Sequence, residues 1–284
     1  MKVDKFRTVI IYITIILLGL VCLLPLLNIV AISFSSSAAV EGNMVGLIPV
    51  GFSTAAYKKI LEDSQFWHSF LISVERVVLT LIINFVLIVL MAYPLSKTNA
   101  QFRGRNIYAN LMIFAMLFNG GMIPTFLLVK SYGLLNTVWA LVLPGAVPIF
   151  NVILVMNFFA AVPKELEEAA FIDGANPLQV LTKIFIPISK PVLATVSLFS
   201  IVGSWNDFYS GLIYMSKATY YPLMTYIQSL QINVEDLIKQ GNLSAVVDSA
   251  SLGNTNLNAA KIVVAVIPLL LIYPLLQRYF VSGI

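Results

Sequence analysis

The chain has 284 residues, of which 59% are hydrophobic and 11% are charged, and its formal net charge is +4. Soluble domains usually contain about 25% charged and about 45–50% apolar residues, so this composition excludes a water-soluble fold and indicates a membrane protein. The single cysteine, Cys22, excludes an internal disulfide, and the single histidine, His68, excludes a metal site built on a histidine pair.

Six stretches are long and apolar enough to cross a bilayer, which takes about 20 helical residues for roughly 30 Å of hydrocarbon. The first stretch follows Lys2, Lys5 and Arg7, as a signal peptide does, but it is longer than a signal-peptide core of about 7–15 residues, so we expect a retained span. The pattern predicts an all-α polytopic fold, one membrane domain over residues 1–284, with spans near residues 8–33, 70–95, 107–129, 138–162, 188–215 and 259–280.

The basic residues predict the orientation of these spans, because cytoplasmic loops carry an excess of Lys and Arg. Short basic clusters lie before the first span, between the second and third, between the fourth and fifth, and near the end of the chain: Lys2, Lys5, Arg7, Lys97, Arg103, Arg105, Lys164, Lys183, Lys190 and Arg278. Both termini are therefore expected in the cytoplasm, with two long outer segments at residues 34–69 and 216–258.

The second span contains Glu75 and Arg76 near its outer end. A charge at the centre of a membrane helix costs at least about 2.5–3.5 kcal/mol, so each one needs a reason. Neighbours in sequence do not face each other on a helix, so these two residues need other partners. We expect Arg76 to extend toward the outer interface, and Asn84 and Asn151 to bond neighbouring helices. Prolines in the fourth span, such as Pro144, are potential kinks.

Residues 163–187, between the fourth and fifth spans, predict two short helices. Pro163 suits the start of the first helix, and the glutamates at 165, 167 and 168 suit the positive end of its dipole. Gly174 suits the left-handed position just past its end. Asn176 and Pro177 are typical of the start of a second helix, which we expect Pro187 to end.

The first of these helices is expected to dock on a partner protein. Its small residues Ala169 and Ala170 permit close approach, and Leu166 and Phe171 offer apolar side chains to a groove. The alternative is an interfacial helix lying on lipid, but such helices usually carry Lys and Arg, whereas this one is acidic in its first half.

The fifth span contains a cluster of polar and aromatic residues that suits a sugar path, since sugars are bound by aromatic faces and hydrogen-bonding side chains. Helix packing is the alternative interpretation. Adjacent residues on a helix point about 100° apart, so not all members can line one channel. The cluster consists of Trp205, Asn206, Asp207 and Tyr209.

The spacing in the loop resembles the EAA signature of ABC importer permeases. Glu-Ala-Ala at 168–170 is followed after three residues by Gly174, and after nine more by Ile-Phe-Ile-Pro at 184–187. The one departure is Ile186, where leucine is usual. In that family the first short helix is the coupling helix, which sits in a cleft of a separate ATPase subunit. The resemblance implies that this ATPase is contacted by Glu168, Ala169, Ala170 and Gly174.

Other stretches resemble the carbohydrate-type permeases of the maltose-type family, and in particular its LplC/YtcP-like branch. That branch is associated with oligosaccharides cut from polysaccharides and includes the second permease subunit of an alginate importer. The resemblance covers nearly the whole chain and rests on residues 50–57, 119–124, 135–137, 202–208 and 277–284.

The resemblance implies an ABC type I permease fold in the cytoplasmic (inner) membrane of a bacterium. The implied partners are a different, homologous permease subunit, two ATPase subunits, an extracytoplasmic solute-binding protein and an oligosaccharide. The chain has no Gly-x-x-x-x-Gly-Lys-Ser/Thr stretch, so we expect ATP and Mg²⁺ on the ATPase subunits and no cofactor, metal or catalytic residue here.

Two other functions are weaker interpretations of the same sequence. A secondary carrier driven by an ion gradient would need intramembrane acidic residues, for which Asp207 and Glu75 are the candidates, and usually internal repeats, which are not evident. An intramembrane enzyme would need a catalytic constellation, and one histidine without a convincing nucleophile argues against it.

Overall fold

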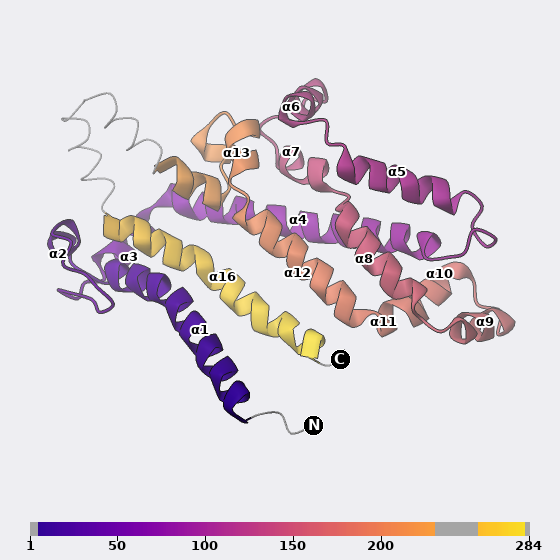
Figure 1. The fold of residues 1–284 in the computed structure, drawn as a ribbon. Helices are drawn as coiled ribbons and strands as arrows, with labels where there is room; N and C mark the ends of the chain where they lie inside the picture. The colour runs from indigo at the N-terminus through magenta and orange to yellow at the C-terminus, as the bar shows by residue number, and fades with distance from the viewer. Residues whose placement is uncertain (1–4, 231–254, 282–284) are drawn as a thin grey trace. The chain divides into compact units, whose positions relative to one another are not determined.

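The computed structural model describes residues 5–230 and 255–281, and within these two ranges it is helical and contains no strand (Figure 1). Lys2, residues 231–254 of the second predicted outer segment, and residues 282–284 lie outside the described part. Two compact units are present, residues 1–67 with 227–268 and residues 68–226 with 269–284. Each unit is described by itself.

In the first unit, contacts from the start of the long helix α16 (Thr255–Val281) hold loop residues of the first predicted outer segment. Asn256 Nδ2 donates to Ser35 O at 3.3 Å, and the buried Lys261 Nζ lies 2.7 Å from Asp63 Oδ2. The helical parts are α1 (Lys5–Ser33), α2 (Ser37–Glu41), α3 (Ala55–Glu62), the start of α4 (Ser64–Leu95) and the first half of α16 (Thr255–Val281).

In the second unit, α8 packs against both α5 and α12, and α13 packs against α7. Val152, Val155 and Val196 lie in its hydrophobic core. The helices that follow α4 are α5 (Arg105–Leu117), α6 (Met122–Ser131), α7 (Val138–Val142), α8 (Ile149–Ala160), α9 (Lys164–Ile172), α10 (Pro177–Val180), α11 (Ile186–Ile188), α12 (Lys190–Asn206) and α13 (Tyr209–Tyr214). Figure 1 shows α9, α10 and α11 at the end of the unit where α8 and α12 approach each other.

Among the residues that the structure describes, three unbroken helices are long and apolar enough to cross a membrane, and they match the first, second and sixth predicted spans. They are Arg7–Ser33, Ser64–Leu95 and Thr255–Pro274. Three bent helix pairs pass the same test together: Arg105–Leu117 with Met122–Ser131 (110°), Val138–Gly145 with Ile149–Ala160 (47°), and Pro177–Ile188 with Lys190–Asn206 (84°).

The first two bends have a local cause. Gly121, with φ +88°, precedes α6 and allows the sharp turn inside the predicted span 107–129. Pro144 and Pro148 interrupt the fourth span, as proline does by removing a backbone donor. The predicted span 188–215 is also not one helix, because Asp207 has an extended backbone (φ −75°, ψ 100°) between α12 and α13.

Candidate functional site

The turn between α9 and α10 has the backbone geometry that the sequence predicts. Gly174 lies just past the end of α9 with φ +80°, a left-handed conformation that glycine adopts without penalty. The N–H groups of Gly174 and Ala175 donate to Phe171 O at 3.0 Å and to Ala170 O at 2.9 Å. These bonds close the first short helix and fix the direction in which its last turn faces.

The second short helix begins with a capping box. Asn176 Oδ1 accepts from the Gln179 N–H, and Gln179 Oε1 accepts from the Asn176 N–H, both at 2.9 Å. A π-helical turn over 181–185 joins α10 to α11. Pro187 lies inside α11, one residue before its end, so the expected termination is displaced to Ser189, where the chain turns into α12.

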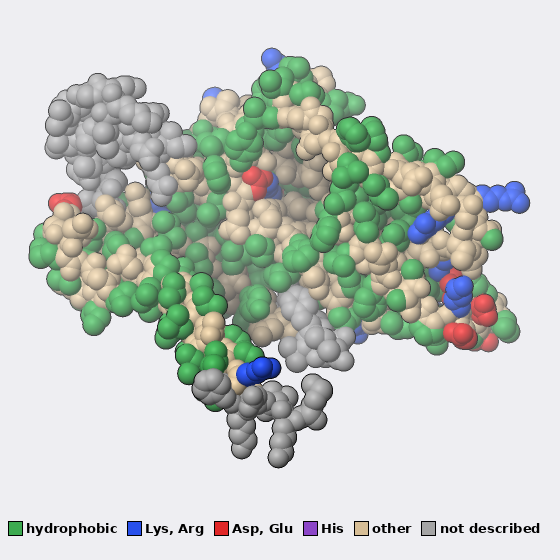
Figure 2. Space-filling view, in the orientation of Figure 1, with side chains coloured by type: hydrophobic (Ala, Val, Ile, Leu, Met, Phe, Trp, Pro, Cys, Tyr) green, Lys and Arg blue, Asp and Glu red, His purple; other side chains and the backbone are tan. Residues whose placement is uncertain are grey.

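The predicted docking residues lie on an exposed surface of this loop. Glu168 and Ala169 are exposed and Ala170 is half-buried, while Leu166 and Phe171 are 43% and 44% exposed. Figure 2 shows acidic, basic and apolar side chains gathered over this end of the second unit. Sequence reasoning missed Ile172 and Leu178, which are 86% and 63% exposed. Two large apolar residues on either side of the Gly174 turn, in a loop rich in polar residues, are the feature of the sequence that indicates an exposed apolar surface here.

Glu167 points the other way, into the second unit. Its Oε2 lies 2.7 Å from Lys97 Nζ, both side chains are 12% exposed, and Tyr93 OH donates to its Oε1 at 3.4 Å. Lys97 Nζ also lies 4.1 Å and 4.3 Å from the ring centroids of Tyr93 and Phe185. Burial lowers the pKa of Lys97, and the carboxylate of Glu167 partly opposes this shift. These contacts of Glu167 and Lys97 hold the first turn of α9 against the end of α4. From the sequence, Glu167 was expected only to interact favourably with the dipole of α9.

A cavity of about 260 Å³ lies among α4, α7, the start of α8, α12 and α13. Its polar lining comes chiefly from two helices whose residues repeat at intervals of four, which places them on one face of each helix. α4 contributes Arg76, Thr80 and Asn84, and α12 contributes Ser200 and Ser204. This four-residue spacing of polar residues can be seen in the sequence and indicates a polar face on each helix, which considering the polar residues one at a time did not reveal.

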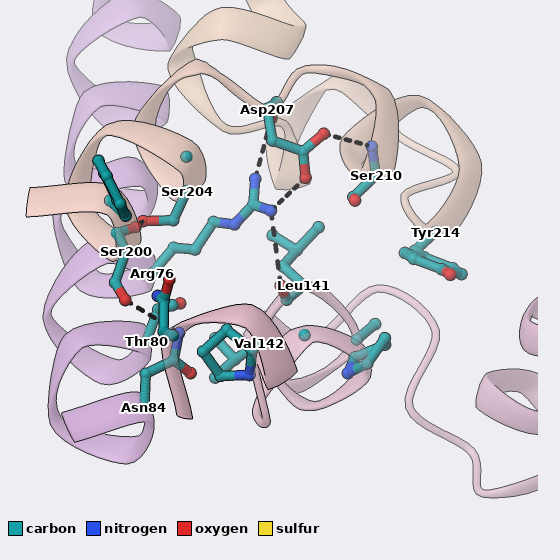
Figure 3. A pocket seen from close by; sticks show the side chains of 17 residues that line it. Arg76, Thr80, Asn84, Leu141, Val142, Ser200, Ser204, Asp207, Ser210 and Tyr214 are labelled. Atoms are coloured by element: carbon teal, nitrogen blue, oxygen red, sulfur yellow. Dashed lines mark hydrogen bonds and ion pairs between the residues drawn. The ribbon is translucent and has the colours of Figure 1, made fainter. Parts of the chain in front are cut away.

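Arg76 and Asp207 form an ion pair at this cavity (Figure 3). Arg76 Nη2 donates to the Asp207 carboxylate and Nη1 donates to the Asp207 carbonyl O at 2.9 Å. That carbonyl belongs to the break between α12 and α13, so the guanidinium satisfies a backbone group that the helix does not. The Ser210 N–H donates to Asp207 Oδ1 at 3.1 Å. The expectation that Arg76 extends toward the outer interface is wrong, because its side chain is 4% exposed and faces Asp207.

The structure places the four predicted path residues in different surroundings, and of these only Asp207 lines the cavity. Trp205 is buried and packs edge-on against Phe70, with ring centroids 5.7 Å apart. Asn206 is exposed at the last position of α12, and Tyr209 is exposed with its OH 2.9 Å from Met122 Sδ. The rest of the predicted cluster does not converge on the cavity, because successive helical residues face different directions.

Comparison with known proteins places this geometry in a family. Residues 74–284 match the family described as binding-protein-dependent transport system inner membrane component. The chain belongs to this family. A solved structure of a bacterial ABC transporter involved in the import of the acidic polysaccharide alginate matches with a TM-score of 0.84 and 33% identity, covering 99% of this chain and 98% of that chain.

Two curated relatives from Bacillus subtilis (strain 168) agree with this assignment. Protein LplC is 40% identical over 93% of this chain and 88% of its own length. The polygalacturonan/rhamnogalacturonan transport system permease protein YtcP is 38% identical over 99% of this chain and 96% of its own length. The chain therefore has the ABC type I permease fold and is an inner-membrane transport component rather than an enzyme.

Proposed function

We propose that this chain is a permease subunit of an ATP-driven importer that moves oligosaccharides across the inner membrane by alternating access. The observation that carries the proposal is the exposed surface of α9. The helix ends at the Gly174 turn, at the position that the EAA spacing requires, and the Glu167–Lys97 ion pair fixes it to the end of α4. The substrate class is supported by the names of relatives, which include the YtcP permease and the 26% identical arabinooligosaccharides permease AraQ of Halalkalibacterium halodurans.

In this proposal α9 enters a groove of an ATPase subunit. Leu166 and Phe171 provide the apolar contacts, Glu168 pairs with a basic group, and Ala169 and Ala170 allow close approach. Two ATPase subunits bind ATP and Mg²⁺, a different homologous permease completes the membrane pair, and a solute-binding protein delivers the saccharide from outside. Nucleotide and loaded binding protein favour different states of the pair, which drives alternating access.

The same proposal treats each bent helix pair as one crossing, so that six spans form a single membrane domain with both termini in the cytoplasm. The basic residues support this orientation, because Lys97, Arg103 and Arg105 then lie on the same side as α9. The ion pair between Lys97 and Glu167 requires the end of α4 and the start of α9 to share one side of the membrane, which agrees with this topology.

An ion-gradient-driven carrier is the competing function. It would need an acidic side chain that is free to take up a proton or sodium ion. Asp207 instead pairs with the buried Arg76 and accepts from the Ser210 N–H. At Asp207, this favours a fixed ion pair over a transport site for cations.

Saccharide uptake by the complete assembly in proteoliposomes tests the proposed function. With a high ATP concentration on the side of the membrane that carries the ATPase subunits, uptake of galacturonate oligosaccharides is expected to continue after ionophores collapse the proton and sodium gradients. A matched preparation with a non-hydrolysable ATP analogue is expected to show no uptake. Uptake that stops with the ionophores while ATP remains high would reject ATP-driven import.

A further inference from the structure

A second cavity, of about 490 Å³, forms a groove between the end of α4, α5 and the start of α8. Its lining is almost wholly apolar, and its volume lies in the range of about 300–1,000 Å³ that is typical of small-molecule sites. Of the residues that line it, Met112 is buried, whereas Leu90 and Leu111 are 50% and 57% exposed. The groove therefore opens at the surface of the second unit and can receive an apolar chain from outside.

Two arginines lie beside this groove, where the chain passes from α4 to α5. Arg105 Nε donates at 2.9 Å to the carbonyl O of Leu95, which lines the groove and is the last residue of α4. Arg103 follows Phe102, another groove residue, whose ring stacks on that of Tyr108 with centroids 5.7 Å apart. Figure 2 shows basic side chains at this end of the unit and apolar ones along α5.

Neither arginine has a carboxylate partner in the described part of the chain. Arg105 donates there to neutral acceptors, which besides Leu95 O are Asn106 Oδ1 at 3.2 Å and Met156 Sδ at 3.9 Å. Arg103 is exposed and forms no ion pair with a described residue. The positive end of the α5 dipole adds to their charge. This end of the groove is therefore complementary to an anion.

An anionic phospholipid matches both features, with an acyl chain in the groove and its phosphate at the arginines. Basic pockets between membrane helices on the cytoplasmic side recognise anionic headgroups in this way. A homologous permease subunit fits this end of the groove less well. Its own cytoplasmic Lys and Arg residues would lie at the same depth and repel Arg103 and Arg105.

We propose that this groove is a binding site for an anionic phospholipid of the inner leaflet. The inference rests on the proposed function, because it takes the end of α4 to lie on the cytoplasmic side. The lipid holds the end of α4 at the level of the headgroups, close to Lys97, through which α9 is attached. It thereby supports the helix end on which the docking element rests.

Photolabelling of the complete assembly in detergent tests the site. The probe is phosphatidylglycerol with a diazirine in its acyl chain, and mass spectrometry of the labelled peptides reports where it binds. Labelling is expected on residues 90–95 and 105–115. Unlabelled phosphatidylglycerol should compete at least about tenfold better than phosphatidylcholine with the same chains, because each basic residue near a headgroup contributes about fivefold.

Arg103→Gln tests the headgroup contact. The probe concentration for half-maximal labelling is expected to rise about fivefold, without a change in the unfolding temperature, because Arg103 is exposed and has no ion pair in the described part of the chain to lose. Lys190→Gln is the matched control. It removes an exposed positive charge at the first residue of α12, which does not line the groove, so labelling should stay within twofold.

Ala115→Phe tests the acyl-chain contact by filling the groove. Ala115 is exposed and lines the groove, so the larger side chain should lower labelling at least about fivefold and leave the core intact. Ile113→Phe is the control, because Ile113 is an exposed residue of the same helix that does not line the groove. Labelling of that variant should stay within twofold of the wild type.

Several outcomes would overturn the site. Equal competition by the two lipids, or equal labelling of Arg103→Gln and Lys190→Gln, would reject the headgroup contact. Unchanged labelling in Ala115→Phe would reject the acyl chain, and loss of the second permease subunit from that variant would assign the groove to that subunit. Labelling requires no ATP. A selective lipid site without ATP-driven uptake therefore retains this inference and rejects the importer, whereas ATP-driven uptake without labelling of the groove does the reverse.

Discussion

Glu167 and Glu168 are neighbours in α9 with opposite surroundings. Glu167 is mostly buried against Lys97, whereas Glu168 is exposed and has no hydrogen-bond or ion-pair partner in the described part of the chain. The about 100° between successive helical residues produces this division, with one carboxylate directed inward and one outward. The two residues therefore give separate experimental access to the anchoring of α9 and to its docking.

Reversing the charge of Glu168 is expected to weaken docking without affecting insertion. Glu168→Lys should lower recovery of the ATPase in co-purification at least about tenfold, because a charge-assisted contact is replaced by repulsion. Glu62→Lys makes the same charge change at an exposed position of α3 and should leave recovery unchanged. Full ATPase recovery and uptake with Glu168→Lys would argue that the residue does not dock.

Neutralising Glu167 is expected to loosen α9. Glu167→Gln leaves the partly desolvated Lys97 without its counter-charge and should lower the free energy of unfolding by about 1–2 kcal/mol, less than for a fully buried pair. It should also raise the ATP hydrolysed per saccharide imported, since α9 is then held less firmly. Glu168→Gln, one residue away and exposed, is the matched control for stability. Equal unfolding temperatures for the two variants would contradict the anchoring role.

At the level of elements, the loop depends on one backbone conformation, that of Gly174. No atom lies within 4 Å of a Cβ added there, so a substitution would be opposed by the left-handed φ of +80° and not by a clash. The turn sets where α9 stops and how α10 begins, and the Asn176 capping box adds two further bonds at the same place. A change at Gly174 should therefore act on the whole docking element.

Gly174→Ala is expected to cost about 1–2 kcal/mol, the usual penalty for a left-handed residue with a Cβ, and to reduce ATPase recovery. Gly174→Asn should recover part of the loss, because asparagine tolerates this conformation. Gly120→Ala, in a loop, meets no atom within 4 Å and has no positive φ, so thermal unfolding should shift little. Identical unfolding of Gly174→Ala and the wild type would show that the turn is not under this constraint.

At the level of the whole molecule, interactions local in sequence could be predicted and distant pairings could not. Gly174 and Asn176 were predictable because caps and turns act within a few residues. The EAA spacing predicted the family, which the comparison confirmed. The Arg76–Asp207 pair joins residues 131 apart and the Lys97–Glu167 pair joins residues 70 apart. A single sequence does not tell which helix faces lie together, so the cavity and the anchor of α9 required coordinates.

The chain turns by 84° between Pro177–Ile188 and Lys190–Asn206, so these two segments form the short and long arms of a bent lever. A force on the short arm along the axis of α12 swings that helix about Ser189 instead of sliding it. α12 is about 25 Å long at 1.5 Å per residue, so a swing of about 5° would move its far end by about 2 Å. Asp207 follows that end, and such a displacement is enough to separate its carboxylate from Arg76. A rotation of a few degrees at Ser189 would therefore be enough to form or break the Arg76–Asp207 ion pair at the far end of α12.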